Sequence, residues 1–137
     1  MIPLISTSWQ YRHKNFMVEV THWDRGLQQT GTVRDLLTLL SPEGSNCWCI
    51  YAYIFPGHPL MGAISAGQVS PVALPLPWHC GQTYRHETFD AQGKPLCVKA
   101  GADYQHYGDE LFSRLTPLDG VPSQIQQDLQ DLVNALT

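Results

Sequence analysis

The chain has 137 residues, 43% of them hydrophobic, which suffices for one domain with its own core and argues against several domains. We therefore expect a single domain spanning residues 1–137. The formal net charge is −4, with three lysines and five arginines. Such a composition provides no basic stripe for a phosphate backbone and argues against nucleic acid as a direct partner.

The sequence shows neither the pattern of a membrane protein nor that of a disulfide-bonded protein. The sequence has no run of about 18 apolar residues and no basic-then-apolar leader, so we expect no membrane span and no signal peptide. The cytoplasm is the expected location. The four cysteines, at positions 47, 49, 80 and 97, form no CxxC pair, and in a cytoplasmic chain we expect packed thiols in place of disulfides.

The first half of the chain predicts two strands and one helix. Residues 15–22 have the β-branched and aromatic content of a strand. Residues 32–40 place apolar side chains at helical spacing after a capping threonine, which predicts a short amphipathic helix. Residues 47–55 are apolar on both alternating faces, so we expect a strand in the middle of a sheet, covered on both sides.

The second half predicts loops, a hairpin and a closing helix. Residues 56–77 contain five of the ten prolines and are expected to form long loops. Residues 83–89 and 96–102 have strand length and are joined by a segment rich in turn residues, which predicts an antiparallel hairpin. After Pro122, a capping-box pattern and an apolar stripe predict a C-terminal helix.

These elements define an expected architecture. We expect an α+β fold in which a mixed but mainly antiparallel sheet has four or five strands. The short helix and the C-terminal helix should pack against one face of the sheet.

Three polar motifs follow the predicted strands, at residues 57–62 (GHPLMG), 78–83 (WHCGQT) and 102–109 (ADYQHYGD). Loops at strand ends commonly carry functional side chains on a rigid scaffold. We therefore expect the polar residues of the three motifs to converge at one end of the sheet. The residues that should meet there are His58, His79, Asp103, His106 and Asp109.

Histidines and aspartates permit two chemistries. Neutral imidazoles and a carboxylate can bind a divalent metal and leave one position open for a water whose pKa the metal lowers. Without metal, a histidine oriented by an aspartate can act as a general base, and backbone N–H groups near Gly81 can hold an anionic oxygen. The alternative is structural, because histidines and aspartates also brace turns through their side chains. The spacing matches no HExxH, EF-hand, P-loop or dinucleotide motif.

At these motifs the chain resembles a group of small uncharacterised proteins of phages and other mobile elements. In that group a GHPxxG segment is followed by HGGxTY, by a GFDxxHxGD-like segment and by a short closing helix. The counterparts here are residues 57–62 (GHPLMG), 79–84 (HCGQTY) and 101–109 (GADYQHYGD). The resemblance covers roughly residues 46–136.

Two positions depart from the group pattern. Cys80 replaces the first glycine of the HGG segment, and Ala102 replaces the aromatic residue before Asp103. The resemblance implies an accessory protein of a phage, prophage or plasmid, and by association a protein that interferes with host defence.

The leading functional hypothesis is a site that binds or hydrolyses a nucleotide-like ligand. In this hypothesis His58 or His106 is the base and Asp103 orients it. His79 and Thr83 contact the substrate, and Asp109 completes the ligand site.

Two alternatives stay open at this point. The first is a non-enzymatic inhibitor that binds a host defence protein through a lightly charged, aromatic surface while the histidines and aspartates are structural. The second is a binding module stabilised by a divalent metal.

Overall fold

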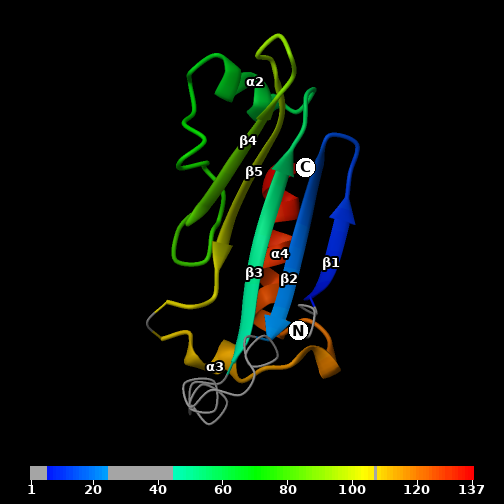
Figure 1. The fold of residues 1–137 in the computed structure, drawn as a ribbon, viewed down its shortest axis with the longest axis vertical. Coiled ribbons are helices and arrows are strands. Elements are labelled where there is room, and N and C mark those ends of the chain that lie inside the picture. Colours follow the sequence, from blue (N-terminus) through cyan, green and yellow to red (C-terminus); the bar gives the residue numbers. More distant parts are fainter. Residues whose placement is uncertain (1–5, 25–44, 107) are drawn as a thin grey trace.

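The computed structural model describes residues 6–24, 45–106 and 108–137. Within them lies one five-stranded sheet, and every pairing in it is antiparallel. The strands follow the order β1-β2-β3-β5-β4, as Figure 1 shows, and a helix packs behind them. They are β1 (Ser6–Arg12), β2 (Phe16–Asp24), β3 (Asn46–Ile54), β4 (Tyr84–Phe89) and β5 (Pro95–Asp103). The expected α+β class is confirmed.

Four of these strands were predicted, and β3 lies in the middle of the sheet as expected. The edge strand β1 was not predicted, because its sequence STSWQYR offers little apolar alternation. It forms by pairing with β2 over its whole length, from Ser6 opposite Trp23 to Arg12 opposite Met17. The helix expected at residues 32–40 lies outside the described residues.

Three α-helices and one 3-10 turn complete the described chain. They are α2 (Pro59–Ser65), α3 (Glu110–Ser113), the 3-10 turn at Pro117–Asp119, and α4 (Ser123–Leu136). The C-terminal helix α4 is confirmed, but no capping box forms at its start, where Pro122 occupies the N-cap position without a side-chain hydrogen bond. The prediction of loops throughout residues 56–77 is wrong for α2.

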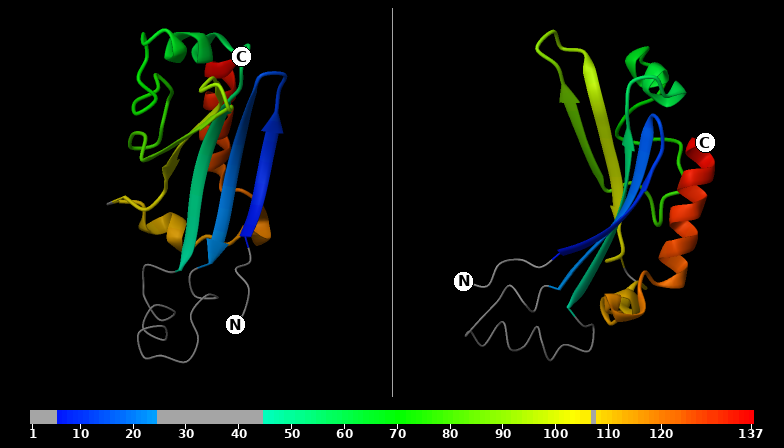
Figure 2. Two further views of the ribbon diagram at one scale, coloured as in Figure 1. Left: turned by 45° about the horizontal axis from the view of Figure 1, so that its top comes forward. Right: turned by 90° about the vertical axis from the view of Figure 1, so that its right-hand side faces the viewer.

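The core lies between α4 and one face of the sheet. Figure 2 shows α4 lying along that face, with α2 on the same side. Along β3 the residues that point toward α4 are fully buried, and Ile125 and Leu132 of α4 pack against them. Burial of each such side chain contributes roughly 1.5 to 3 kcal/mol, so this layer supplies the main driving force for folding.

The opposite face of the sheet is only half-covered in the described part of the chain. Here Tyr51 and Tyr53 of β3 are half-buried, and Lys99 of β5 places its Nζ 4.3 and 5.1 Å from the centres of their rings. The Tyr51 ring fills the space beside Gly101, where a Cβ would lie 2.3 Å from its Cδ1. The expectation that β3 is covered on both sides is therefore not met among these residues.

No disulfide joins the cysteines in the part of the chain that the structure describes. Cys47 is buried, Cys49 and Cys97 are half-buried, and Cys80 is exposed. Burial raises the pKa of the Cys49 and Cys97 thiols above the ordinary value. Packed thiols are thus found on the strands, whereas Cys80 stands apart as an accessible one.

None of the helices in residues 6–24, 45–106 and 108–137 has the length and hydropathy that a membrane crossing requires.

Candidate functional site

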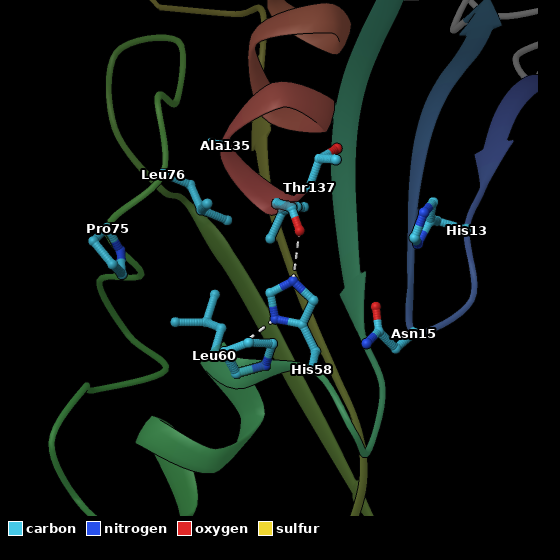
Figure 3. A pocket seen from close by; sticks show the side chains of 10 residues that line it. His13, Asn15, His58, Leu60, Pro75, Leu76, Ala135 and Thr137 are labelled. Carbon is cyan, nitrogen blue, oxygen red and sulfur yellow. Dashed lines mark hydrogen bonds between the residues drawn. The ribbon is translucent and has the colours of Figure 1, made fainter.

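His58 lies at the end of the sheet where β3 finishes, next to the C-terminal end of α4 (Figure 3). It is the N-cap of α2, and its Nδ1 accepts a hydrogen bond of 3.0 Å from the Leu60 backbone N–H. Its Nε2 donates to the Leu136 carbonyl oxygen at 2.8 Å. Both ring nitrogens are therefore engaged with backbone groups in a side chain that is 8% exposed. The interpretation of His58 as a catalytic base is not supported by this geometry.

A cavity of about 580 Å³ opens beside His58, and Figure 3 shows the side chains around it. Its wall is mostly apolar, and the polar side chains besides His58 are those of His13, Asn15 and Thr137. The lining residues are His13, Asn15, His58, Pro59, Leu60, Pro75, Leu76, Ala135, Leu136 and Thr137. None of the other predicted site residues lines this cavity, so the expected convergence of all three motifs is wrong.

The other two motifs do meet, at the end of the sheet where β3 begins and β5 finishes. His79 Nε2 lies 2.8 and 3.0 Å from the two carboxylate oxygens of Asp109. His106 Nδ1 lies 3.3 Å from Asp109 Oδ2 and 3.5 Å from Asp103 Oδ1. We call His79, Cys80, His106 and Asp109 the His/Asp cluster, and Asp103 lies at its border.

The loop after β5 holds the carboxylate of Asp109 in place. The His106 backbone N–H donates to Asp109 Oδ2 at 2.9 Å, and the Asp109 N–H donates to the His106 carbonyl at 2.9 Å. The two residues therefore close a tight turn on each other. The loop after β5 is held to β3 where it begins, because the Tyr104 backbone N–H donates to the Trp48 carbonyl oxygen at 3.0 Å.

His79 packs against the rings of Tyr104 and Phe112, which we call the aromatic wall. The imidazole stacks on the Tyr104 ring with centroids 4.4 Å apart, and Phe112 of α3 meets it edge-on at 5.8 Å. Tyr104 is buried, and its hydroxyl donates to Asp128 Oδ2 of α4 at 2.5 Å. Because α4 in this way anchors Tyr104, the position of His79 is tied to the core.

Cys80 and Gly81 turn the chain immediately after His79. Both residues have left-handed backbone conformations, with φ of +54° and +93°. Such a conformation is uncommon for a residue with a side chain. It leaves the Cys80 Sγ 3.7 Å from His79 Nε2, so an accessible thiol joins the cluster. Cys80 was not among the predicted site residues, although its place next to His79 was the available signal.

Thr83 has a backbone role. Its N–H donates to the Gly101 carbonyl at 2.9 Å, which continues the β4–β5 ladder, and its side chain is exposed. No contact between Thr83 and the His/Asp cluster is among those of the described residues. Its expected role in substrate contact stays a prediction.

The cluster combines a buried acid with accessible bases. The Asp109 side chain is 7% exposed, whereas those of His79, His106 and Asp103 are 19%, 28% and 38% exposed. The hydrogen-bond pattern assigns the Nδ1–H of His106 to the carboxylates, which leaves its Nε2 as the basic nitrogen. Asp109 thus orients both imidazoles, while Asp103 is a more distant and exposed neighbour.

Tyr104 of the aromatic wall should make the stability of the folded protein depend on pH. Burial, and then the Asp128 carboxylate, raise the pKa of Tyr104 above its ordinary value of 10.0. The folded state keeps this proton after the unfolded chain has lost it, so the contribution is complete below pH 10.0 and is lost as the pH rises further. Tyr104 alone should lower the free energy of unfolding by about 1.4 kcal/mol per pH unit above that point, in addition to the losses from Tyr51 and Tyr53, whose pKa burial also raises.

Urea denaturation at a series of alkaline pH values measures this effect. The variant Tyr104→Phe has no phenol to ionise and should show a shallower loss of stability than the wild type. Identical slopes for the two proteins would contradict the assignment.

No protein-family model, no curated protein and no solved structure matches the chain.

Proposed function

We propose that the His/Asp cluster binds a small phosphorylated ligand of the nucleotide type and hydrolyses it. The observation that carries this proposal is the buried carboxylate of Asp109, which contacts the imidazoles of both His79 and His106. A carboxylate that fixes one tautomer of a partly exposed histidine is the arrangement that general-base catalysis needs.

The residues take different parts in this reaction. Asp109 accepts the Nδ1–H of His106, so His106 Nε2 takes a proton from a water molecule that attacks phosphorus. The bond from phosphorus to the leaving oxygen then breaks, and the proton passes to that oxygen. His79, held against Tyr104, contacts the phosphoryl group. Compared with the expectation from sequence, Asp109 replaces Asp103 as the orienting acid and His58 has no part.

The same proposal includes a biological role. The segments at residues 79–84 and 101–109, which carry much of the resemblance to phage and mobile-element proteins, provide all members of the cluster. We therefore propose an accessory protein of a phage or mobile element that acts against host defence. Removal of a nucleotide signal would give such a protein its effect.

Incubation of the purified protein with a panel of mono-, di-, tri- and cyclic nucleotides tests the activity, with product analysis by chromatography. We expect turnover of one nucleotide class and a roughly 100-fold or greater loss in His106→Gln. The matched control is His86→Gln, because His86 is an exposed histidine of β4 outside the cluster. Turnover that is equal in the two variants, or absent with every nucleotide, would overturn the proposal.

One observation favours the inhibitor as a second candidate. The half-covered face of the sheet gathers Tyr51, Tyr53 and Tyr84 around Lys99, whose Nζ lies 5.4 Å from the Tyr84 ring centre. Tyrosines with few charges are typical of the centre of a protein interface. If this candidate is correct, Tyr84→Ala abolishes counter-defence activity in cells while His106→Gln retains it. The opposite pattern supports hydrolysis.

A further inference from the structure

We infer that the His/Asp cluster binds a divalent transition metal of the zinc type. The donors are His79 Nε2, Cys80 Sγ, His106 Nδ1 and a carboxylate oxygen of Asp109, and these atoms all lie within 4.8 Å of one another. The inference rests on the same site as the proposed function and names a further ligand for it.

Two of the six donor pairs already have the spacing that a tetrahedral ion requires, and the four donor atoms lie within 4.8 Å of one another, so the remaining pairs need only small shifts of the side chains. Bonds of about 2.0 to 2.1 Å to nitrogen or oxygen and about 2.3 Å to sulfur place neighbouring donors roughly 3.3 to 3.6 Å apart. In the cluster, His106 Nδ1 lies 3.3 Å from Asp109 Oδ2, and Cys80 Sγ lies 3.7 Å from His79 Nε2. The His79–Asp109 distances of 2.8 and 3.0 Å are those of a hydrogen bond and need to widen by a few tenths of an ångström.

The kinds of donor atom select the ion. Two imidazoles, a thiolate and one carboxylate suit zinc, cobalt or nickel, whereas magnesium and calcium require a shell of oxygens. Protons must leave the donor atoms before a metal binds, because the Cys80 thiol and the N–H groups that His79 and His106 direct at Asp109 all occupy donor positions. We therefore expect metal binding to weaken as the pH falls.

The support around the donors is also that of a metal site. Asp109 is held by the His106 backbone N–H at 2.9 Å, and His79 is held by its stack on Tyr104. Residues that orient the ligands in this way are a regular part of metal sites and tune their affinity. The two loops are therefore pre-arranged to place their donors around one point.

Cys80 is the exchangeable ligand in this arrangement. It is exposed, and among the contacts of the cluster its thiol meets only His79. If a water molecule replaced Cys80 on the ion, the ion would lower the pKa of that water and so supply the activation that we assign to His106 in the metal-free protein.

Titration of the metal-free protein with Co²⁺ tests the inference directly. We expect one equivalent to bind, with the visible bands of tetrahedral cobalt and a thiolate-to-cobalt charge-transfer band in the near ultraviolet. One equivalent of Zn²⁺ should bleach both. Cys80→Ser should abolish the charge-transfer band and weaken binding, whereas the control Cys97→Ser, which alters a thiol on β5, should behave like the wild type.

The results separate the two proposals. The inference is overturned if no band appears at micromolar Co²⁺, or if His106→Gln and Cys80→Ser bind cobalt as well as the wild type, since the metal then binds elsewhere. Nucleotide turnover without metal binding would leave the proposed function intact and remove the metal. Stoichiometric binding that depends on Cys80, without turnover of any nucleotide, would do the reverse.

Discussion

His58→Ala is expected to destabilise the protein by about 2 to 4 kcal/mol, because two backbone hydrogen bonds disappear together. The Leu60 N–H loses its acceptor at the first turn of α2, and the Leu136 carbonyl loses its donor near the end of α4. The second loss leaves a polar group without a partner in a buried contact, which is the more costly kind. Urea denaturation followed by tryptophan fluorescence measures the change.

His86→Ala is the matched control for this prediction. His86 is an exposed histidine in the middle of β4, so its replacement should change stability by no more than about 0.5 kcal/mol. If the two alanine variants are equally stable, the bracing role of His58 is wrong. If His58→Ala remains folded at low temperature, its nucleotide turnover per folded molecule should equal that of the wild type, since His58 lies outside the His/Asp cluster.

Of the five residues predicted to converge, the structure brings His79 together with His106 and Asp109, and Asp103 lies beside His106. This part of the prediction follows from the predicted hairpin. In an antiparallel hairpin the start of the first strand lies beside the end of the second, and Tyr84 indeed pairs with Gly101. Residues that precede β4 and residues that follow β5 are therefore brought to the same end of the sheet. This inference needs only the hairpin, which the turn residues between the strands indicated clearly.

His58 was misplaced for a related topological reason. β3 pairs antiparallel with β5, so the loop after β3 leaves the sheet at the end opposite to the loop after β5. The order of strands in the sheet was not available from the pattern of residues, and without it the three loops were assumed to share one end. The antiparallel pairing of β3 with β5 therefore places the cavity beside His58 and the His/Asp cluster at opposite ends of the sheet.

The observed strands and helices show which sequence patterns predicted secondary structure correctly. β2, β3, β5 and α4 bury apolar side chains, and the pattern of those residues predicted them. β4 is mostly exposed, and it was predicted from its length and from the turn residues that join it to β5. β1 is polar and depends on its partner strand. α2 was hidden in a proline-rich segment, although Pro59 at the first helical position is a favourable start for a helix and His58 provides the side-chain cap.

Asp109→Asn is expected to reduce nucleotide turnover by about 100-fold or more and to abolish high-affinity cobalt binding. Asp109 accepts hydrogen bonds from the imidazoles of His79 and His106 and from the His106 backbone N–H. An amide of the same shape offers only one acceptor oxygen and turns its own N–H groups toward these donors. Because the side chain is buried, we also expect stability to fall by about 1 to 3 kcal/mol.

Asp103→Asn is a control with the same chemical change and the same sequence distance from His106. Asp103 lies three residues before His106 and Asp109 three residues after it, but the Asp103 side chain is 38% exposed and 3.5 Å from the ring nitrogen. An exposed pair of this kind contributes about 0 to 1 kcal/mol, so turnover should change by about fivefold at most. If the two variants lose turnover equally, Asp109 is not the orienting acid, and if only Asp103→Asn loses it, the role predicted from the sequence is restored.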